Sequence, residues 1–428
     1  MSFILRGAAA ALALCAWTGG ALASSCGRPT GVSSQISPGE PLTLAAVISE
    51  IRLASPAIRA AGLEARALGA EADQAGRWNN PTLTFEVENF AGSNRLSGFD
   101  RTESTVAIEQ TFRLGGKRVL EERAARAREA LGSAQCEVIL RESQLEAATL
   151  FAELLAAIQL RGLAQENSAL ADELVRIAAR RVEAGAGASP ELSRAQADAS
   201  ALHASVEAAQ AGVDRRAYEL ALLWGSAQPT FSEPIGLSLD DTASEAEHAM
   251  AHPALSAADA AVRVRQAESD FARSAIIPDV NVSAGVRRFE ETGDEAFVAS
   301  VSVPLPIFDR GRGTTRAAVI RGDAAALNRA AAEQRLLAEQ RAAVAAQRSA
   351  QRRLQILQSD TVPAAQQAYE AAARGYQIGR FDLTTTLNAR AALLSAQLDV
   401  VDAEFALLSA ELRLRALIGA APFDGDPR

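Results

Sequence analysis

The sequence has 428 residues and a formal net charge of −9, and 48% of its residues are hydrophobic while only 5% are aromatic. An acidic chain lacks the basic face that nucleic acid requires, so nucleic acid is excluded as a partner. Three cysteines and three histidines, without a CxxC pair or a His/Cys cluster, predict no metal site and no cofactor. Motifs of the GxSxG, P-loop and HExxH kinds are absent from the sequence, which predicts that the protein is not an enzyme.

Residues 1–23 have the features of a secretory signal peptide. An apolar stretch over 7–17 follows a basic start, and Ala21-Leu22-Ala23 forms an A-x-A cleavage site. The alternative is an ordinary buried N-terminal helix. Cys26 lies just after the cleavage site, where a lipoprotein carries its acyl anchor, so lipidation of Cys26 is a further option. The sequence thus predicts an exported chain.

After a linker at 24–41, residues 42–225 predict a helix, two strands and a long helical hairpin. The helical pattern ends before Pro81, and apolar and polar side chains then alternate over 82–88 and again over 103–114. A polar, glycine-containing loop joins these two stretches, which is the pattern of a β-hairpin.

The long helix is predicted over 117–182, where no proline occurs and apolar residues recur at steps of three and four. Such a helix is about 100 Å long and needs a coiled coil or a tube to hold it. A turn at 183–190 then reverses the chain, because Gly185 can end the first helix and Ser189 can cap the next. The returning helix has a heptad pattern, which predicts coiled-coil packing.

The second half of the chain, residues 241–419 after a linker at 226–240, predicts the same order of elements again. Pro253 and Pro278 are 25 positions apart, as are Pro56 and Pro81, and this spacing indicates an internal two-fold repeat. The elements predicted in this half are strands at 279–287 and 295–308, a long helix at 314–377 interrupted only at Pro363, a turn at 379–382, a returning helix, and a tail at 420–428.

All four predicted strands alternate apolar and polar side chains, which suits lipid on one side and water on the other. Strands of about 9–12 residues can cross a membrane, but a barrel needs about eight of them or more. The missing strands must therefore come from other subunits. The alternative is two amphipathic hairpins packed on a soluble core. By this alternation Glu86 and Glu88 are candidate lumen carboxylates, or else solvated strand residues.

Over residues 42–419 the sequence resembles the TolC family of outer-membrane factors. Within that family, the GGKR segment at 115–118 is similar to the heavy-metal branch, the cobalt-zinc-cadmium resistance channels of the CzcC kind. The segments that carry the resemblance, in the family's order, are the strand starts at Asn80-Pro81 and Ile277-Pro278, the PLPIFDRGRG segment from Pro304, and the two reversal turns.

The resemblance implies a mainly α fold with a membrane β-barrel part, in which three subunits of four strands each form a 12-stranded barrel on a long α-helical coiled-coil tunnel. It implies a homotrimer in the outer membrane, surrounded by outer-membrane lipid, with its tunnel in the periplasm. The implied partners are an inner-membrane RND pump and a periplasmic adaptor, and the implied cargo is cobalt, zinc, cadmium or nickel. The alternatives are a channel for drugs or other small molecules, and a periplasmic adaptor, which would have one helical hairpin rather than two.

The two reversal turns match the periplasmic tips, where members of this family gate the tunnel and meet the adaptor. Glu191 and Asp382 would place negative charge at helix N-termini. Leu192 and Leu383 would extend heptad packing to an adaptor hairpin. The alternative is that these are ordinary turn residues. The predicted docking and gating set is Gly185, Ser189, Glu191, Leu192, Gly379, Phe381, Asp382 and Leu383.

Overall fold

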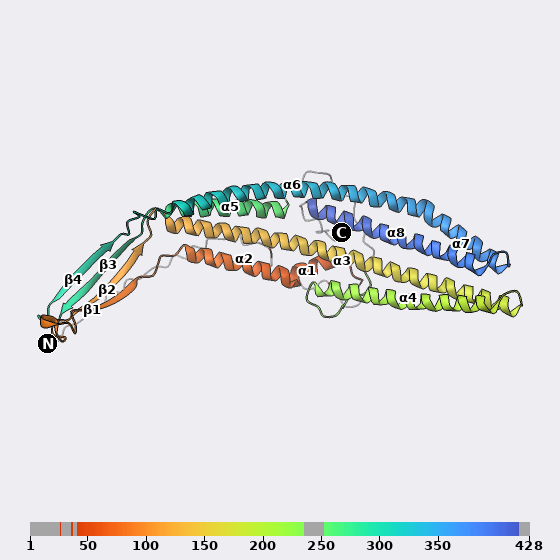
Figure 1. Cartoon of the computed structure of the whole chain (residues 1–428), viewed down its shortest axis with the longest axis horizontal. Coiled ribbons are helices and arrows are strands. Elements are labelled where there is room, and N and C mark those ends of the chain that lie inside the picture. Colours follow the sequence, from red (N-terminus) through yellow and green to blue (C-terminus); the bar gives the residue numbers. More distant parts are fainter. Residues whose placement is uncertain (1–25, 27–35, 37–40, 235–251, 419–428) are drawn as a thin grey trace.

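The computed structural model describes residues 26, 36, 41–234 and 252–418, which form one elongated molecule (Figure 1). A sheet lies at one end, and helices run from it to the other end, where two helical hairpins turn back (Figure 1). The predicted signal peptide at 1–23 and tail at 420–428 lie outside the described residues. So do most of the linker at 24–41 and part of the linker at 226–240.

The first half of the chain folds in the predicted order. Its elements are α1 (Leu44–Ala54), α2 (Pro56–Ala75), β1 (Thr82–Glu88), a 3-10 turn η1 (Asn94–Leu96), β2 (Glu103–Phe112), α3 (Lys117–Glu183) and α4 (Ser189–Leu222). The proline-free stretch forms one helix of 67 residues, α3, which is about 100 Å long. Gly116 precedes it with a φ of 71°, a left-handed conformation that glycine adopts without strain.

The second half departs from the prediction at one strand. Its elements are α5 (Pro253–Ser274), β3 (Val280–Phe289), β4 (Glu295–Ser302), α6 (Arg312–Ile356), a π-helical turn η3 (Leu357–Thr361), α7 (Val362–Gln377) and α8 (Leu383–Ile418). The prediction of a strand to residue 308 is wrong, because β4 ends at Ser302. Pro304 and Pro306 follow, and neither has an N–H group for a strand ladder. The predicted interruption at Pro363 is confirmed, since the π turn lies just before this proline.

The four strands form one antiparallel sheet in the order β1-β2-β3-β4. Pairing of β2 with β3, for example Val106 with Val286, joins the two predicted hairpins into this sheet. Over most of the sheet the registers align apolar positions with apolar positions, which gives the sheet an apolar face and a polar face. Within the described chain, β1 and β4 each keep one unpaired edge.

Within the part of the chain that the structure describes, no element covers the apolar face of the sheet. The strands extend beyond the helices (Figure 1), and the side chains of Phe85 and Phe297 are 68% and 94% exposed. A soluble protein rarely leaves a continuous apolar patch open to water, so packing of the hairpins on a soluble core does not fit this structure. The other members of the apolar face are Leu83, Val87, Val106, Ile108, Val282, Ala284, Val286, Ala299 and Val301.

An apolar core lies where α1, α3, α4 and α8 meet. Phe151 and Leu154 of α3 pack there with Leu220 and Leu412, and each of these side chains is 1% exposed or less. Full burial of such a side chain stabilises the fold by about 1.5–3 kcal/mol. Among the described residues, α3 also contains the one window that is long and apolar enough to cross a membrane. About one third of this window, 33%, is buried inside the described structure.

A disulfide joins Cys26 to Cys136 of α3, at a Cα–Cα distance of 6.0 Å. Both side chains are buried in the apolar core. The structure therefore contradicts the option that Cys26 is lipidated, because a sulfur atom in a disulfide cannot carry an acyl anchor. The disulfide instead attaches Cys26 to the first third of α3.

Candidate functional site

The first hairpin tip turns at Gly185, as predicted. Gly185 has a φ of 69°, and the amide of Ala186 donates to the carbonyl oxygen of Arg181 at 2.8 Å, which closes the last turn of α3. The prediction that Ser189 caps α4 is wrong. Ala188 holds the N-cap position without a side-chain hydrogen bond, and Ser189 is the first helical residue. Pro190 follows in the first turn of α4, where its missing N–H group leaves one donor fewer without a partner.

The second hairpin tip turns at Gly379, which has a φ of 75°. The amide of Arg380 donates to the carbonyl oxygen of Gly375 at 2.7 Å. Asp382 caps α8 as predicted, because its Oδ1 accepts from the amide of Thr385 at 2.8 Å. Hydrogen bonds from the Thr385 side chain and amide lower the pKa of Asp382, so the carboxylate stays ionised at the start of the helix.

Phe381 of the second tip folds back over Gly375 of α7. A Cβ atom at residue 375 would lie 2.1 Å from Cδ2 of Phe381, so only glycine leaves room for the ring. The Phe381 side chain is still 46% exposed, and Ile378 beside it is 74% exposed. Sequence analysis missed Gly375 and Ile378, because neither the contact with the ring nor the exposure follows from spacing along a helix.

Leu192 and Leu383, which were predicted to offer packing to a partner, lie in the chain's own tip cluster. Leu383 is only 2% exposed and packs with Leu174, Ile177 and Tyr376. Leu192 is partly buried against the same cluster. In this arrangement Leu383 has no free surface, so the apolar surface of the second tip consists of Ile378 and Phe381.

Three side chains hold the two tips together, and we call Arg181, Tyr376 and Glu191 the tip latch. Nη1 of Arg181 donates to the carbonyl oxygen of Tyr376 at 2.6 Å, and the guanidinium lies 4.8 Å from the centroid of the Tyr376 ring. The Tyr376 hydroxyl donates to Oε2 of Glu191 at 3.3 Å. Burial raises the pKa of Tyr376, and the Glu191 carboxylate raises it further, so the hydroxyl keeps the proton that it donates.

The contact between the hairpins continues along α4. Glu191, Arg194 and Asp198 are three and four residues apart, so they lie on one face of this helix. Nη1 of Arg194 donates to Oγ1 of Thr384 at 3.1 Å. Asp198 forms an ion pair with Arg390 of α8, which is only 5% exposed. Sequence analysis missed these partners, because charged residues on a heptad helix usually face water.

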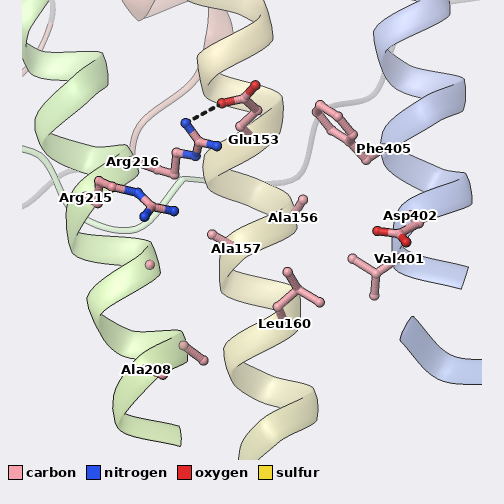
Figure 2. Close-up of a pocket in the computed structure, with 12 residues that line it drawn as sticks. Glu153, Ala156, Ala157, Leu160, Ala208, Arg215, Arg216, Val401, Asp402 and Phe405 are labelled. Atoms are coloured by element: carbon pink, nitrogen blue, oxygen red, sulfur yellow. Dashed lines mark ion pairs between the residues drawn. The ribbon is translucent and has the colours of Figure 1, made fainter. Parts of the chain in front are cut away.

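Away from the tips, small side chains leave a groove of about 490 Å³ between α4 and α8, with α3 as its floor (Figure 2). In the groove, Arg216 of α4 and Glu153 of α3 form an ion pair at 2.9 Å. At this level the groove separates α4 from α8, but α8 still contacts α3, because Nε2 of Gln159 donates to Oε2 of Glu404 at 3.1 Å. The lining residues labelled in Figure 2 are Glu153, Ala156, Ala157, Leu160, Ala208, Arg215, Arg216, Val401, Asp402 and Phe405.

The polar face of the sheet contains both predicted lumen carboxylates. Glu86 lies opposite Thr105, and Glu88 lies opposite Glu103. Arg287 of β3 forms ion pairs of 2.9 Å with both Glu88 and Glu103. Sequence analysis missed this role of Arg287, because only the pairing of β2 with β3 brings it to residues from the other half of the chain.

The described histidines are dispersed. Nε2 of His203 lies 3.2 Å from Asp172, and Nδ1 of His252 accepts from the amide of Ala254 at 3.2 Å at the start of α5. His248 lies outside the described residues. Within 26, 36, 41–234 and 252–418, no group of three or more His, Cys, Asp or Glu side chains is placed to hold a metal ion.

The chain belongs to the outer membrane efflux protein family, whose sequence profile matches residues 47–226 and 247–420. It is 32% identical over 291 residues to the nickel-cobalt-cadmium resistance protein NccC of Alcaligenes xylosoxydans xylosoxydans, a match that covers 63% of this chain and 62% of NccC. It is 28% identical over 389 residues to the cobalt-zinc-cadmium resistance protein CzcC of Cupriavidus metallidurans, covering 89% of this chain and 87% of CzcC. The match thus spans less than two thirds of the length of NccC.

Two solved structures share the fold. The outer-membrane channel OprN superposes with a TM-score of 0.77 at 20% identity, over 92% of this chain and 96% of OprN. The outer membrane protein VceC of Vibrio cholerae superposes with a TM-score of 0.73 at 21% identity, over 88% of this chain and 96% of VceC. The predicted family and outer-membrane location are confirmed, and both family and fold are those of channel proteins.

Proposed function

We propose that this chain is the outer-membrane channel of a tripartite RND-type efflux system that exports divalent heavy-metal cations, namely cobalt, zinc, cadmium or nickel. The observation that carries the proposal is the two-faced sheet at the end of helices about 100 Å long, with an uncovered apolar face for lipid and a polar face for water. The names of the relatives NccC and CzcC support the choice of cargo.

The working unit that we propose is a homotrimer. In lipid, the backbone groups on the free edges of β1 and β4 need hydrogen-bond partners, because no water is present to satisfy them. Pairing of β4 with β1 of the next subunit satisfies both edges and, with three subunits, gives twelve strands, a number that closes a membrane barrel. The helices would then form the periplasmic tunnel below the barrel.

The hairpin tips are the proposed site of gating and of docking to the periplasmic adaptor. They lie farthest from the sheet (Figure 1), as a partner of an inner-membrane pump would require. The tip latch holds the second hairpin against the first, so its release would let the second tip move. Ile378 and Phe381 supply the exposed apolar surface for a helical partner.

An acidic channel suits a cationic cargo. The polar face of the sheet contains Glu86, Glu88, Glu103 and Glu109, and it contains Arg287 as a positive charge. Excess negative charge raises the local concentration of hydrated cations. A channel must also release its cargo, so the sites along its wall have to be weak.

Deletion of the gene in the native host tests the cargo. We expect lower tolerance of cobalt, zinc, cadmium or nickel salts in the growth medium, restored by a plasmid copy, and unchanged tolerance of organic drugs. Greater drug sensitivity with unchanged metal tolerance would assign the chain to drug efflux instead.

Two tip variants test docking and gating. Gly379→Val forces a β-branched residue into a left-handed conformation, and Ile378→Asp places a charge on the exposed apolar surface. Both should abolish metal tolerance at a normal membrane level. Leu327→Asp is the matched control for Ile378→Asp, because Leu327 of α6 is equally exposed, at 72%, but lies away from the tips. Tolerance that survives both tip variants would place docking and gating elsewhere.

A further inference from the structure

Two carboxylates face each other on the polar side of the sheet. Glu88 of β1 and Glu103 of β2 are directly opposite in the antiparallel register. Side chains placed in this way have Cβ atoms about 4.5–5.5 Å apart, and like charges at that distance repel each other. The pair therefore needs a positive charge close to both carboxylates.

Arg287 supplies that positive charge from the neighbouring strand. Arg287 is in β3 and lies opposite Thr105 of β2. Glu103 is two residues before Thr105 on the same strand, so it is diagonally adjacent to Arg287. Its Nη2 is 2.9 Å from Oε2 of Glu88 and its Nη1 is 2.9 Å from Oε2 of Glu103. Its Nε donates to Oγ1 of Thr105 at 3.0 Å. All three nitrogens of the guanidinium are thus used, and the one side chain connects three strands.

The groups around Arg287 are also ligands for divalent cations. Carboxylate and hydroxyl oxygens bind such cations, and here two carboxylates and one hydroxyl converge on a single position. The side chains of Glu88 and Glu103 are 42% and 22% exposed, so both are open to an ion from solvent. A cation in place of the guanidinium would have three protein oxygens from Glu88, Glu103 and Thr105 within reach.

We propose that Arg287 is a built-in counter-ion that keeps Glu88 and Glu103 from binding divalent cations, so that the cargo passes the sheet without being retained. This inference rests on the proposed function, in which the polar face is the wall of the channel. Glu86 keeps the wall acidic on the same face, while Arg287 neutralises the directly opposite carboxylates of Glu88 and Glu103.

A purely structural role for Arg287 makes a different prediction. If the guanidinium only ties β1, β2 and β3 together, its removal weakens the sheet and creates no affinity for metal. If it masks a site, its removal leaves two carboxylates that a metal ion can neutralise. Gain of metal binding therefore separates the two roles, whereas loss of stability does not.

The test is metal binding by the purified full-length protein in detergent, measured by calorimetry with Co²⁺ or Zn²⁺ as the probe. We expect Arg287→Gln to bind about one ion per chain at least about tenfold more tightly than the wild type. The added change Glu103→Gln should remove the gained binding. Arg288→Gln is the matched control, because Arg288 is the next residue, belongs to the opposite face and lies 3.4 Å from Glu290.

Assembled Arg287→Gln protein that binds Co²⁺ no better than the wild type would overturn the inference. If this variant does not assemble, Arg287→Met also removes the positive charge while keeping an unbranched side chain, and it should bind Co²⁺ more tightly than the wild type. Wild-type affinity in Arg287→Met would then overturn the inference. Unchanged metal tolerance after gene deletion would reject the proposed cargo, whereas absence of gained binding would reject only the masked site.

Discussion

The two helical hairpins contain the same order of elements but are held in different ways. In the first hairpin, α3 is one unbroken helix of 67 residues that buries side chains from Ala124 to Ala178. In the second hairpin, the π turn at Leu357–Thr361 divides α6 from α7. The buried residues of α6 are Ala318, Leu336 and Ala343.

This difference indicates a division of labour between the hairpins. The first hairpin is a strut, fixed to the apolar core by the packing of α3 and by the Cys26–Cys136 disulfide. The second hairpin rests on the strut through α8 and the tip latch, and the π turn with Pro363 provides a point at which it can bend. We therefore expect that opening of the tunnel moves the second tip and leaves the first in place.

Removal of the disulfide should have the largest effect and should act on the strut. Cys136→Ser opens a crosslink between residues separated by 110 positions, and loss of such a crosslink lowers the free energy of unfolding by about 3–4 kcal/mol. Denaturant unfolding of the purified protein measures this loss, and the wild type under reductant is the control. Unchanged stability would mean that the core fixes α3 without the disulfide.

Arg390→Ala should have the next largest effect, at the contact between the hairpins. It leaves the Asp198 carboxylate without its buried partner, which costs about 2–3 kcal/mol at a partly exposed pair. Hydrogen exchange should become faster at the tip ends of α4 and α8. Arg353→Ala is the control, because Arg353 pairs with Asp399 on an exposed surface and should change stability by no more than about 0.5 kcal/mol. Equal exchange in the two variants would show that the Arg390–Asp198 ion pair does not hold the hairpins together.

Gly375→Ala should destabilise the second tip by about 1–2 kcal/mol, because the new methyl group meets the Phe381 ring. Gly322→Ala in α6 is the matched control, since a Cβ atom there meets nothing within 4 Å and alanine favours a helix. Thermal midpoints should move down for the first variant and up for the second. A shift in the same direction for both would show that the ring does not need the space.

The smallest expected effect is a pH dependence of the protein's stability that arises from His252, at the start of α5. Burial lowers the pKa of His252, and Arg141 lowers it further, so the folded state favours the neutral ring whose Nδ1 caps α5. Because the unfolded chain binds this proton more readily, stability is greatest above about pH 6.5 and falls as the pH drops through that value toward the folded pKa. Thermal midpoints at pH 7.5 and pH 5 should differ less in His252→Asn, which keeps a capping side chain. An equal difference in His252→Asn and in the wild type would contradict a role for His252 in this pH dependence.

Local patterns predicted the elements of the fold well. The absence of proline between 117 and 182 predicted α3 to within one residue. Gly185 and Gly379 marked the two turns, because glycine adopts the left-handed backbone conformation found there without strain. Alternation predicted the two faces of the sheet. The end of β4 was missed, because the apolar pattern continues beyond Ser302 while the prolines stop the ladder.

Contacts between distant parts of the chain were not predictable in the same way. Cys26 and Cys136 are 110 residues apart, and Arg181 and Tyr376 are 195 residues apart, so no local spacing connects them. The position of Arg287 depends on the pairing of strands from different halves, which a repeat pattern does not specify. Sequence alone therefore located the tips and the strand carboxylates, and the fold supplied their partners.

The mass of the purified protein in detergent tests the central claim most directly. One chain has a mass of 44.8 kDa before any processing, and its described residues form four strands with two free edges. A membrane barrel made from such chains needs three of them to reach twelve strands, so native mass spectrometry should find three copies in the detergent-solubilised particle. A stable, detergent-solubilised monomer would contradict the account, because its strand edges would remain unpaired in lipid.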